Sequence, residues 1–280
     1  MFVPGVSPVS PVLTITWVDR RGREEPIPAP ERSYFTLRLS PDGTKIVTET
    51  AVGGEQRSLW VFDLARQTMT PLTLQPGRYA APVWTPDGRR ILFASNHGTI
   101  LDNQVFAQAA DGTGVAEPLT NSANSMSPSS VSPDGTRVVI HEITLNDRDS
   151  NLALLTLGPK RRVEPLLQTQ FRESDGEISP DGRWLAYQSN DSGQDQIYVR
   201  PFPNVNDGRW PISPAGGSRP VWSPAGRELF YVTGSNGALS VMAVPIQTAP
   251  TFSAGRGHKT IRRSLFSWAR SLRSRVRRLA

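Results

Sequence analysis

Short apolar runs separated by polar turns follow one another along most of the chain. Residues 83–96, VWTPDGRRILFASN, lead an apolar run into Thr-Pro-Asp-Gly and continue in a second apolar run, which is the pattern of a β-hairpin. Nearly the same hairpin recurs with turns at residues 40–43, 132–135, 179–182 and 223–226, at steps of 45, 47, 47 and 44 residues along the five turns. A period of about 40–50 residues with several short strands predicts the blades of a β-propeller.

Each repeat unit predicts four antiparallel strands. In the second unit, PVW stands before the turn, RILFASN follows it, QVFAQAA comes after a polar loop, and AEPLTN closes the unit. The other units follow the same order, with alternating or fully apolar strands, although the fourth strand is weak. We therefore predict an all-β protein, a β-propeller of four-stranded antiparallel blades.

The repeated turn has a physical explanation. Pro at its second position presets φ near about −65°, Asp accepts hydrogen bonds from nearby backbone N–H groups, and Gly adopts the positive φ that lets the next strand leave. The fifth turn has Ala225 where the others have Asp, so we expect it to be weaker. Because each Asp belongs to a different blade, these residues are predicted to be structural and not to form a metal or catalytic site. The predicted turn residues are Pro41, Asp42, Gly43, Pro86, Asp87, Gly88, Pro133, Asp134, Gly135, Pro180, Asp181, Gly182, Pro224 and Gly226.

On these residues the chain resembles the TolB-type, WD-repeat-like bacterial propellers, whose blades carry an apolar residue or Trp followed by Ser-Pro-Asp-Gly. The segments PVWTPDGRRILFASN and ISPDGRWLAYQSNDSGQDQIYVRPFP carry the resemblance, which covers about residues 13–255. WVDRRGREEP and YVRPFP also resemble the propeller that follows some bacterial Ser/Thr protein kinase domains. This second resemblance implies a sensor propeller that has become detached from its kinase.

The number of strands predicts an incomplete ring. TITWVDRRG and REEPIPAP have the pattern of a third and a fourth strand, without a first and a second strand before them. Six blades are therefore expected, five of them complete and the closing one incomplete. A closing hairpin should follow residues 250–255, but no Ser-Pro-Asp-Gly appears there. We accordingly predict a flexible segment at residues 1–12, the propeller at 13–255 and a separate tail at 256–280.

The tail differs from the rest of the chain in charge. It contains nine of the 31 Lys and Arg residues and no acidic residue, which leaves 22 basic against 25 acidic residues in the body. The body therefore gives no electrostatic reason to expect nucleic acid. Apolar residues at helical spacing predict an amphipathic helix, and three interpretations stay open: a helix on an anionic membrane or partner, a helix covering the open side of the ring, or a shifted reading frame. The apolar positions are Ile261, Leu265, Trp268, Leu272, Val276 and Leu279.

The sequence lacks the motifs of catalysis and the spacing of a metal site, and this predicts a binding protein. The chain has no Cys, no G-x-S-x-G nucleophile elbow and none of the kinase motifs. Its histidines, His97, His141 and His258, lack the spacing of a metal site. We predict no catalytic, cofactor-binding or metal-binding residue. The expected function is non-catalytic binding or sensing of a protein, a peptide or a small ligand at a propeller face.

Two alternatives stay open: a TolB-like periplasmic scaffold, and a propeller hydrolase or the accessory domain of a peptidase. The compartment is also open. No run reaches the roughly 18 apolar residues of a membrane helix, and the first residues lack a signal-peptide pattern, so the chain as written predicts a cytoplasmic protein. A fragment of a membrane kinase or a TolB-like protein would be extracytoplasmic. A monomer is expected.

Overall fold

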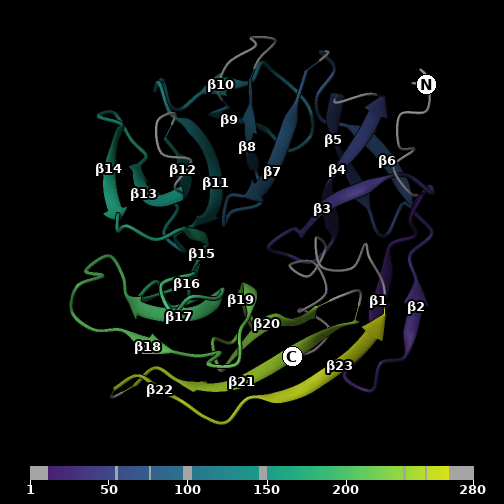
Figure 1. Ribbon diagram of the computed structural model, residues 1–280. Helices are drawn as coiled ribbons and strands as arrows, with labels where there is room; N and C mark the ends of the chain where they lie inside the picture. The colour runs from purple at the N-terminus through teal and green to yellow at the C-terminus, as the bar shows by residue number, and fades with distance from the viewer. Residues whose placement is uncertain are drawn as a thin grey trace, which may run out of the picture.

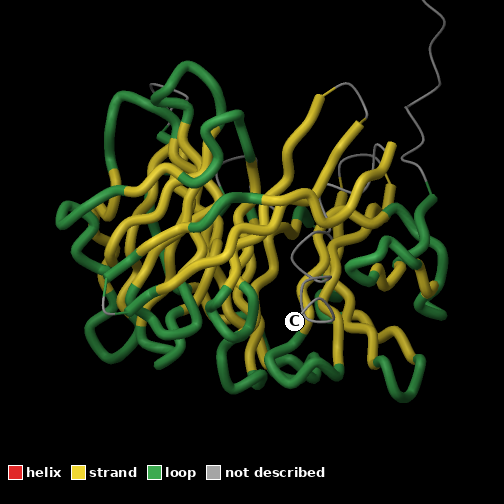
Figure 2. Tube along the Cα trace, turned by 90° about the horizontal axis from the view of Figure 1, so that it is seen from below, coloured by secondary structure: helices red, strands yellow, loops and turns green. Residues whose placement is uncertain are grey.

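A computed structural model describes residues 12–53, 56–75, 77–96, 103–144, 150–235, 238–249 and 251–264. Its described residues form strands and turns and no helix, and the sheets stand side by side in a ring (Figures 1 and 2). Hence no described helix could cross a membrane. The all-β class and the four-stranded antiparallel blades predicted from the repeat are confirmed.

Five sheets are complete blades, and each follows the chain order from the channel outwards. Blade one consists of β3 (Tyr34–Leu39), β4 (Lys45–Gly53), β5 (Gln56–Asp63) and β6 (Thr68–Pro71). Blade two consists of β7 (Tyr79–Trp84), β8 (Arg90–Ser95), β9 (Gln104–Ala109) and β10 (Glu117–Pro118). Blade three consists of β11 (Ser125–Val131), β12 (Arg137–Ile143), β13 (Ser150–Thr156) and β14 (Arg162–Leu167). Blade four consists of β15 (Glu173–Ile178), β16 (Trp184–Ser189), β17 (Gln196–Pro201) and β18 (Trp210–Pro211), and blade five contains β19 (Ser218–Trp222), β20 (Glu228–Ser235) and β21 (Ala238–Gln247).

Blade five takes its outer strand from the predicted tail. β23 (His258–Ser264), from the predicted tail, pairs antiparallel with residues 238–243 of β21, and β22 (Ser253–Ala254), from the end of the predicted propeller, pairs with Ile246 and Gln247. At residues 258–264 the backbone is thus extended, and the predicted amphipathic helix is wrong there: the unpaired edge of β21 offers these residues backbone hydrogen bonds that an isolated helix does not. The remaining positions of that helix, from Leu265 onwards, lie outside the described residues.

The sixth position of the ring is occupied by two described strands. β1 (Thr16–Val18) and β2 (Glu24–Pro26) form a separate antiparallel sheet between blade five and blade one (Figure 1). Val18 packs into a cluster with blade five, whereas Ile15 and Ile27 pack with blade one. This small sheet therefore has the place of the outer strands of a sixth blade, as the strand pattern predicts.

The hydrophobic core lies between the blades. Each pair of consecutive complete blades shares one cluster, to which the third strand of the earlier blade and the first two strands of the later blade contribute. Between blades one and two, for example, Leu59 of β5 packs with Ile91 and Phe93 of β8, and all three side chains are fully buried. The two faces of every complete blade are thus apolar, which explains the nearly continuous apolar strands of the repeat.

Candidate functional site

Four of the five repeated turns form the same hydrogen-bonding network. In the third turn, the Ser132 hydroxyl donates to Asp134 at 2.5 Å and accepts from the backbone N–H of Arg137 at 2.9 Å, while the backbone N–H of Thr136 donates to Asp134 at 3.0 Å. Corresponding bonds occur in the first, second and fourth turns. The hydroxyl of Ser40 and the backbone N–H of Thr44 lower the pKa of the equivalent Asp42 to about 2.

All five turn glycines have the left-handed backbone conformation, with φ between 70° and 76°. Each of the last four also faces the proline of the preceding turn. A Cβ placed on Gly182 would lie 3.5 Å from Cδ of Pro133, so the turns of neighbouring blades stand in contact. The predicted turn residues therefore border one mouth of the channel, which we call the turn-side mouth. The facing pairs are Pro41 and Gly88, Pro86 and Gly135, Pro133 and Gly182, and Pro180 and Gly226.

A cavity of about 330 Å³ opens at the turn-side mouth. All five blades contribute to its wall, through the ends of their inner strands and through the turn prolines. Trp84 and Trp222 pack between blades and are nearly buried, so only their edges reach the cavity. The lining residues are Arg38, Trp84, Pro86, Val131, Pro133, Glu177, Ile178, Ser179, Pro180, Val221, Trp222, Ser223 and Pro224.

An ion pair crosses the channel below this cavity. Nη1 of Arg38, on blade one, lies 2.7 Å from Oε1 of Glu177, on blade four. Nη2 of Arg38 donates to the carbonyl oxygen of Ser129, on blade three, at 2.8 Å. The indole N–H groups of Trp84 and Trp222 donate to the carbonyl oxygens of Arg38 and Glu177, both at 3.0 Å. One polar network therefore joins the inner strands of all five complete blades.

The Arg38–Glu177 pair is shielded from water. The two side chains are 15% and 12% exposed. Burial raises the pKa of Glu177 to about 7, although the guanidinium of Arg38 acts in the opposite direction. Asp175, which lies two residues earlier with φ of 52°, adds negative charge and raises the pKa further. A carboxylate held in this way loses its charge more readily than an exposed one.

The repeat pattern of the sequence did not identify the Arg38–Glu177 pair, although the two residues share one position of the repeat. Arg38 and Glu177 occupy the same repeat position, two residues before the turn Ser, where the other blades have Val83, Ser130 and Val221. Opposite charges at equivalent positions of two blades indicate a contact across the channel, because equivalent positions of a propeller point towards the same axis.

The two histidines that the structure describes lie on different blades. His141 is half-buried in β12, desolvation lowers its pKa, and the nearby Asp175 opposes that shift. His258 lies in β23 opposite Ala243, far along the chain from His141. His97 lies outside the described residues. Within residues 12–264 as described, no group of three His, Cys, Asp or Glu side chains could hold a metal ion.

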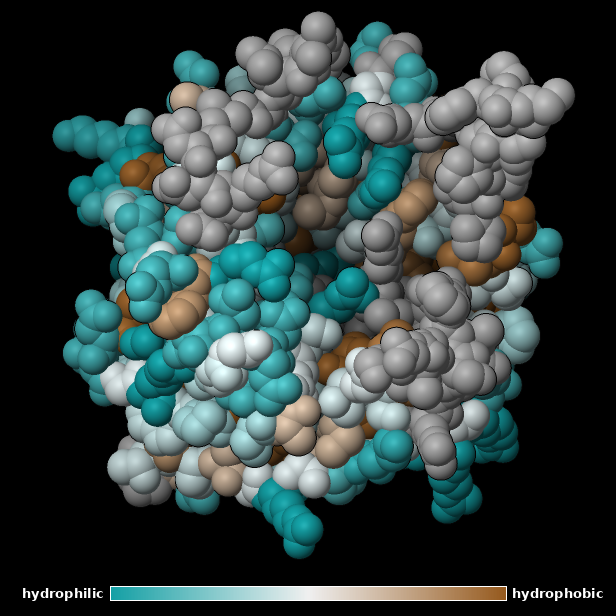
Figure 3. All heavy atoms as spheres, in the orientation of Figure 1, coloured by the Kyte–Doolittle hydropathy of each residue, from teal (hydrophilic) through white to brown (hydrophobic). Residues whose placement is uncertain are grey.

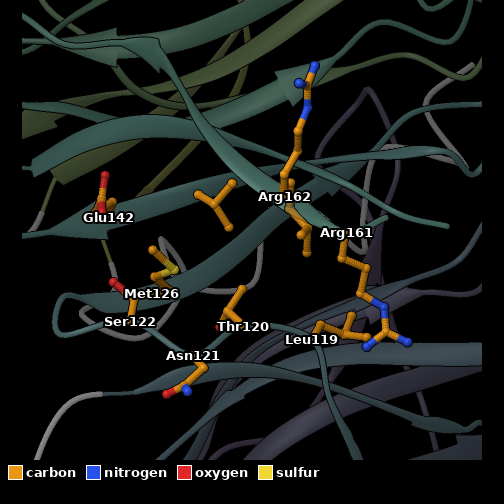
Figure 4. Close-up of a pocket in the computed structure, with 10 residues that line it drawn as sticks. Leu119, Thr120, Asn121, Ser122, Met126, Glu142, Arg161 and Arg162 are labelled. Atoms are coloured by element: carbon orange, nitrogen blue, oxygen red, sulfur yellow. The ribbon is translucent and has the colours of Figure 1, made fainter. Parts of the chain in front are cut away.

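A second cavity, of about 390 Å³, lies between blades two and three (Figure 4). It is lined by Arg161 and Arg162 of the basic GPKRR segment, but their guanidinium groups point in different directions. Arg161 pairs with Glu117, and Arg162 lies 3.0 Å from Glu164. Because both charges are compensated locally and do not converge, this cavity is a weaker candidate for a ligand site than the turn-side mouth.

Comparison with known proteins agrees with this architecture. No family model matches the chain. A protein from Agrobacterium tumefaciens whose solved structure was assigned to TolB superposes with a TM-score of 0.73 at 16% identity, with 91% of each chain covered. The chain has a TolB-like β-propeller fold. A puromycin-hydrolyzing peptidase from Mycobacterium tuberculosis shares the fold at a TM-score of 0.61 and 18% identity, over 88% of this chain and 41% of the peptidase.

Two curated relatives match parts of this TolB-like propeller. The Tol-Pal system protein TolB of Anaeromyxobacter dehalogenans (strain 2CP-C) is 28% identical over 111 residues, which are 39% of this chain and 25% of that protein. The uncharacterized peptidase YuxL of Bacillus subtilis (strain 168) is 24% identical over 191 residues, 55% of this chain and 29% of the peptidase. The matched region spans less than a third of either relative.

Proposed function

We propose that this protein is a non-catalytic, TolB-like scaffold that binds a segment of a partner protein at the turn-side mouth. The observation that carries the proposal is the cavity of about 330 Å³, to which all five complete blades contribute. The likeness to TolB structures supports the scaffold interpretation, whereas the kinase-linked sensor role receives no support from the comparisons.

The chemistry of the mouth suits a peptide segment. Pro133, Pro180 and Pro224 are exposed on the rim, so they present rigid apolar surface at little entropic cost. Val131 and Ile178 provide apolar lining, and Glu177 contributes the one carboxylate among the lining residues. Apolar walls with a few fixed polar groups are typical of sites that bind side chains of a partner. The coloured part of the face in Figure 3 is mainly hydrophilic, with apolar residues in separate spots.

The second candidate function is that of a propeller domain that accompanies a hydrolase, as in peptidases that contain a propeller. The likeness to YuxL and to the mycobacterial peptidase favours it. The chain itself lacks the nucleophile elbow of such enzymes, and the described residues hold no metal-binding group. In this case too the propeller acts by binding, so the two candidates differ in the attached partner and not in the chemistry of the mouth.

A displayed library of random twelve-residue peptides tests the proposal. Peptides selected on the protein should lose at least about tenfold in affinity when Val131→Glu places a charge in the cavity wall. Val163→Glu is the matched control, because Val163 is 37% exposed on β14 and lies outside the mouth. Equal binding to both variants would contradict the proposed site. Turnover of an ester, glycoside or peptide substrate by the purified protein would contradict the non-catalytic role.

A further inference from the structure

Two charged side chains lie in the wall of the turn-side cavity. Arg38 of β3 and Glu177 of β15 line it, and its other lining residues are apolar side chains, prolines and two serines. The serines, Ser179 and Ser223, are buried, and their hydroxyl oxygens each accept a backbone N–H of their own turn at 3.0 Å. A charged group that enters the cavity therefore meets Arg38 and Glu177 and no other charge among the lining residues.

Arg38 is held in this wall by uncharged groups as well as by Glu177. Nη2 of Arg38 donates to the carbonyl oxygen of Ser129 at 2.8 Å, and the carbonyl oxygen of Arg38 accepts from the indole N–H of Trp84 at 3.0 Å. A guanidinium has five N–H donors, so Arg38 can bond a further acceptor in the cavity while it keeps the bond to Ser129. The position of Arg38 thus does not depend on the charge of Glu177.

The negative charge of Glu177 is removed by a proton near neutral pH. Burial raises the pKa of Glu177 to about 7, whereas an acidic side chain of a peptide has a pKa of about 4. Between pH 6 and pH 8 the peptide carboxylate is hence ionised, while Glu177 changes from mainly protonated to mainly ionised. A protonated Glu177 leaves the charge of Arg38 uncompensated in the cavity wall, and its own O–H becomes a hydrogen-bond donor.

This difference favours an anionic ligand over a cationic one. A ligand ammonium would place a second positive charge beside Glu177, and the guanidinium of Arg38 cannot lose its proton to relieve the repulsion. A ligand carboxylate would place a second negative charge beside Arg38, but Glu177 can give up its charge by binding a proton. Because like charges repel more strongly in a site that is shielded from water, only the anionic ligand leaves one charge of each sign in the cavity.

We propose that the turn-side mouth recognises an acidic side chain of the partner segment through Arg38, and that Glu177 takes up one proton from solvent when this side chain binds. The ligand carboxylate then replaces Glu177 as the ionic partner of Arg38, and the neutral carboxyl group of Glu177 remains beside the new pair. The inference rests on the proposed function of the turn-side mouth and adds the chemistry by which the mouth selects its partner.

Other titratable groups lie near Glu177 and have to be separated from it. Asp175 adds negative charge to Glu177, and His141 interacts in turn with Asp175. A histidine is the side chain that ordinarily titrates nearest to the range from pH 6 to pH 8, so His141 is the residue to exclude. Strands β11 and β13, which also pack against β15, carry no charged residue. The remaining charged or titratable residues on the strands packed against β15 are Arg137 and Glu142 of β12, Tyr187 of β16 and Arg219 of β19.

Peptides selected at pH 6 from the displayed twelve-residue library, and then synthesised with amidated C-termini, test the inference. The selected sequences should contain an Asp or Glu whose replacement by Asn or Gln lowers the affinity at pH 6 by at least about tenfold. The acidic peptide should bind about tenfold more weakly at pH 8 than at pH 6, because one proton is bound together with it. Calorimetry in two buffers of different ionisation enthalpy should show the uptake of close to one proton per bound peptide at pH 8.

Variants of the protein assign the proton to Glu177. Glu177→Gln imitates the protonated acid, so it should bind the acidic peptide equally at pH 6 and pH 8 and without proton uptake. His141→Gln is the matched control and should retain the tenfold difference. Combining Arg38→Gln with Glu177→Gln removes both charges together and leaves neither unpaired, and this protein should bind the acidic peptide and its amide counterpart equally. The Tm of each variant shows whether it is folded under the conditions of the assay.

The outcomes distinguish this inference from the proposed function. Equal affinities of the acidic and amide peptides for the unchanged protein would overturn it, as would a pH dependence that persists in Glu177→Gln or disappears in His141→Gln. Peptides that lose affinity on Val131→Glu but not on removal of their carboxylate would leave the binding site in place and refute only the role of Arg38 and Glu177. Peptides insensitive to Val131→Glu, or a library that yields no binding peptide, would refute both.

Discussion

The fifth turn offers a gain-of-stability experiment, because it lacks one component of the repeated network. The hydroxyl oxygen of Ser223 accepts from the backbone N–H of Glu228 at 3.0 Å, as its equivalents do in the other turns. Ala225 cannot accept the hydroxyl proton of Ser223 or the backbone N–H of Arg227, which are the donors that the other turns direct to Asp. The substitution Ala225→Asp should restore both bonds.

The size of the effect follows from the third turn. There Asp134 accepts from Ser132 at 2.5 Å and from the amide and hydroxyl of Thr136 at 3.0 and 2.9 Å. A hydrogen bond contributes about 0.5–1.5 kcal/mol net, and exposure of these carboxylates to water places them near the lower value. Ala225→Asp should therefore raise the free energy of unfolding by about 1 kcal/mol. Asp134→Ala should lower it by about 1–2 kcal/mol, since three bonds are lost.

Urea unfolding at several pH values measures both changes. The Ser132 hydroxyl and the Thr136 amide lower the pKa of Asp134 in the folded protein. A lowered pKa adds stability above the unfolded value of about 4, and this stability is lost as the pH falls through the folded value. The effect of each substitution should hence be complete at pH 7 and shrink below about pH 4. A neutral or destabilising Ala225→Asp at pH 7 would refute the view that Asp completes the turn.

Three further substitutions test the channel and the packing. Because burial raises the pKa of Glu177 to about 7, the contribution of this residue to stability is complete below about pH 4.5 and is lost as the pH rises through about 7. In that window the stability difference between the protein and Glu177→Gln should change by up to about 1.4 kcal/mol per pH unit. Parallel pH profiles would contradict the raised pKa of Glu177. Gly176→Ala would place a Cβ 2.7 Å from Cγ1 of Val139 on the neighbouring blade, so calorimetry should show a loss of about 1–3 kcal/mol, and an unchanged Tm would contradict this packing. Arg20→Ala removes an exposed ion pair with Glu228 and should cost less than about 1 kcal/mol in urea unfolding, and a larger loss would show that the contact is more than a surface pair.

The blades were predictable because their determinants are local. Each hairpin combines a turn with fixed chemistry and two apolar strands, and the pattern is repeated five times. The outer strand of blade five was not predictable in the same way. Residues 258–264 include three Lys or Arg residues and one His and have helical apolar spacing with the residues after them, yet they pair with β21 because its edge requires a partner. Tertiary context thus overrides the local pattern at the end of the propeller.

Local sequence patterns also could not predict the polar network of the channel. Arg38 and Glu177 are 139 residues apart, and only the ring geometry brings their strands to the same axis. Turn residues can be read from four adjacent positions, but a contact across a channel depends on the number of blades and on the tilt of each inner strand. Comparison of equivalent repeat positions supplies the missing information, since the two charges interrupt a position that is otherwise apolar or small.

The same network bears on the stability of an incomplete ring. Blade one and blade five share no apolar cluster among the described residues, and each packs against residues in or beside the small sheet of β1 and β2 instead. Arg38 connects blade one directly to blades three and four, and Trp222 connects blade five to blade four. These bonds do not pass through the sixth position. They can therefore keep the five complete blades in register independently of the apolar contacts at the sixth position.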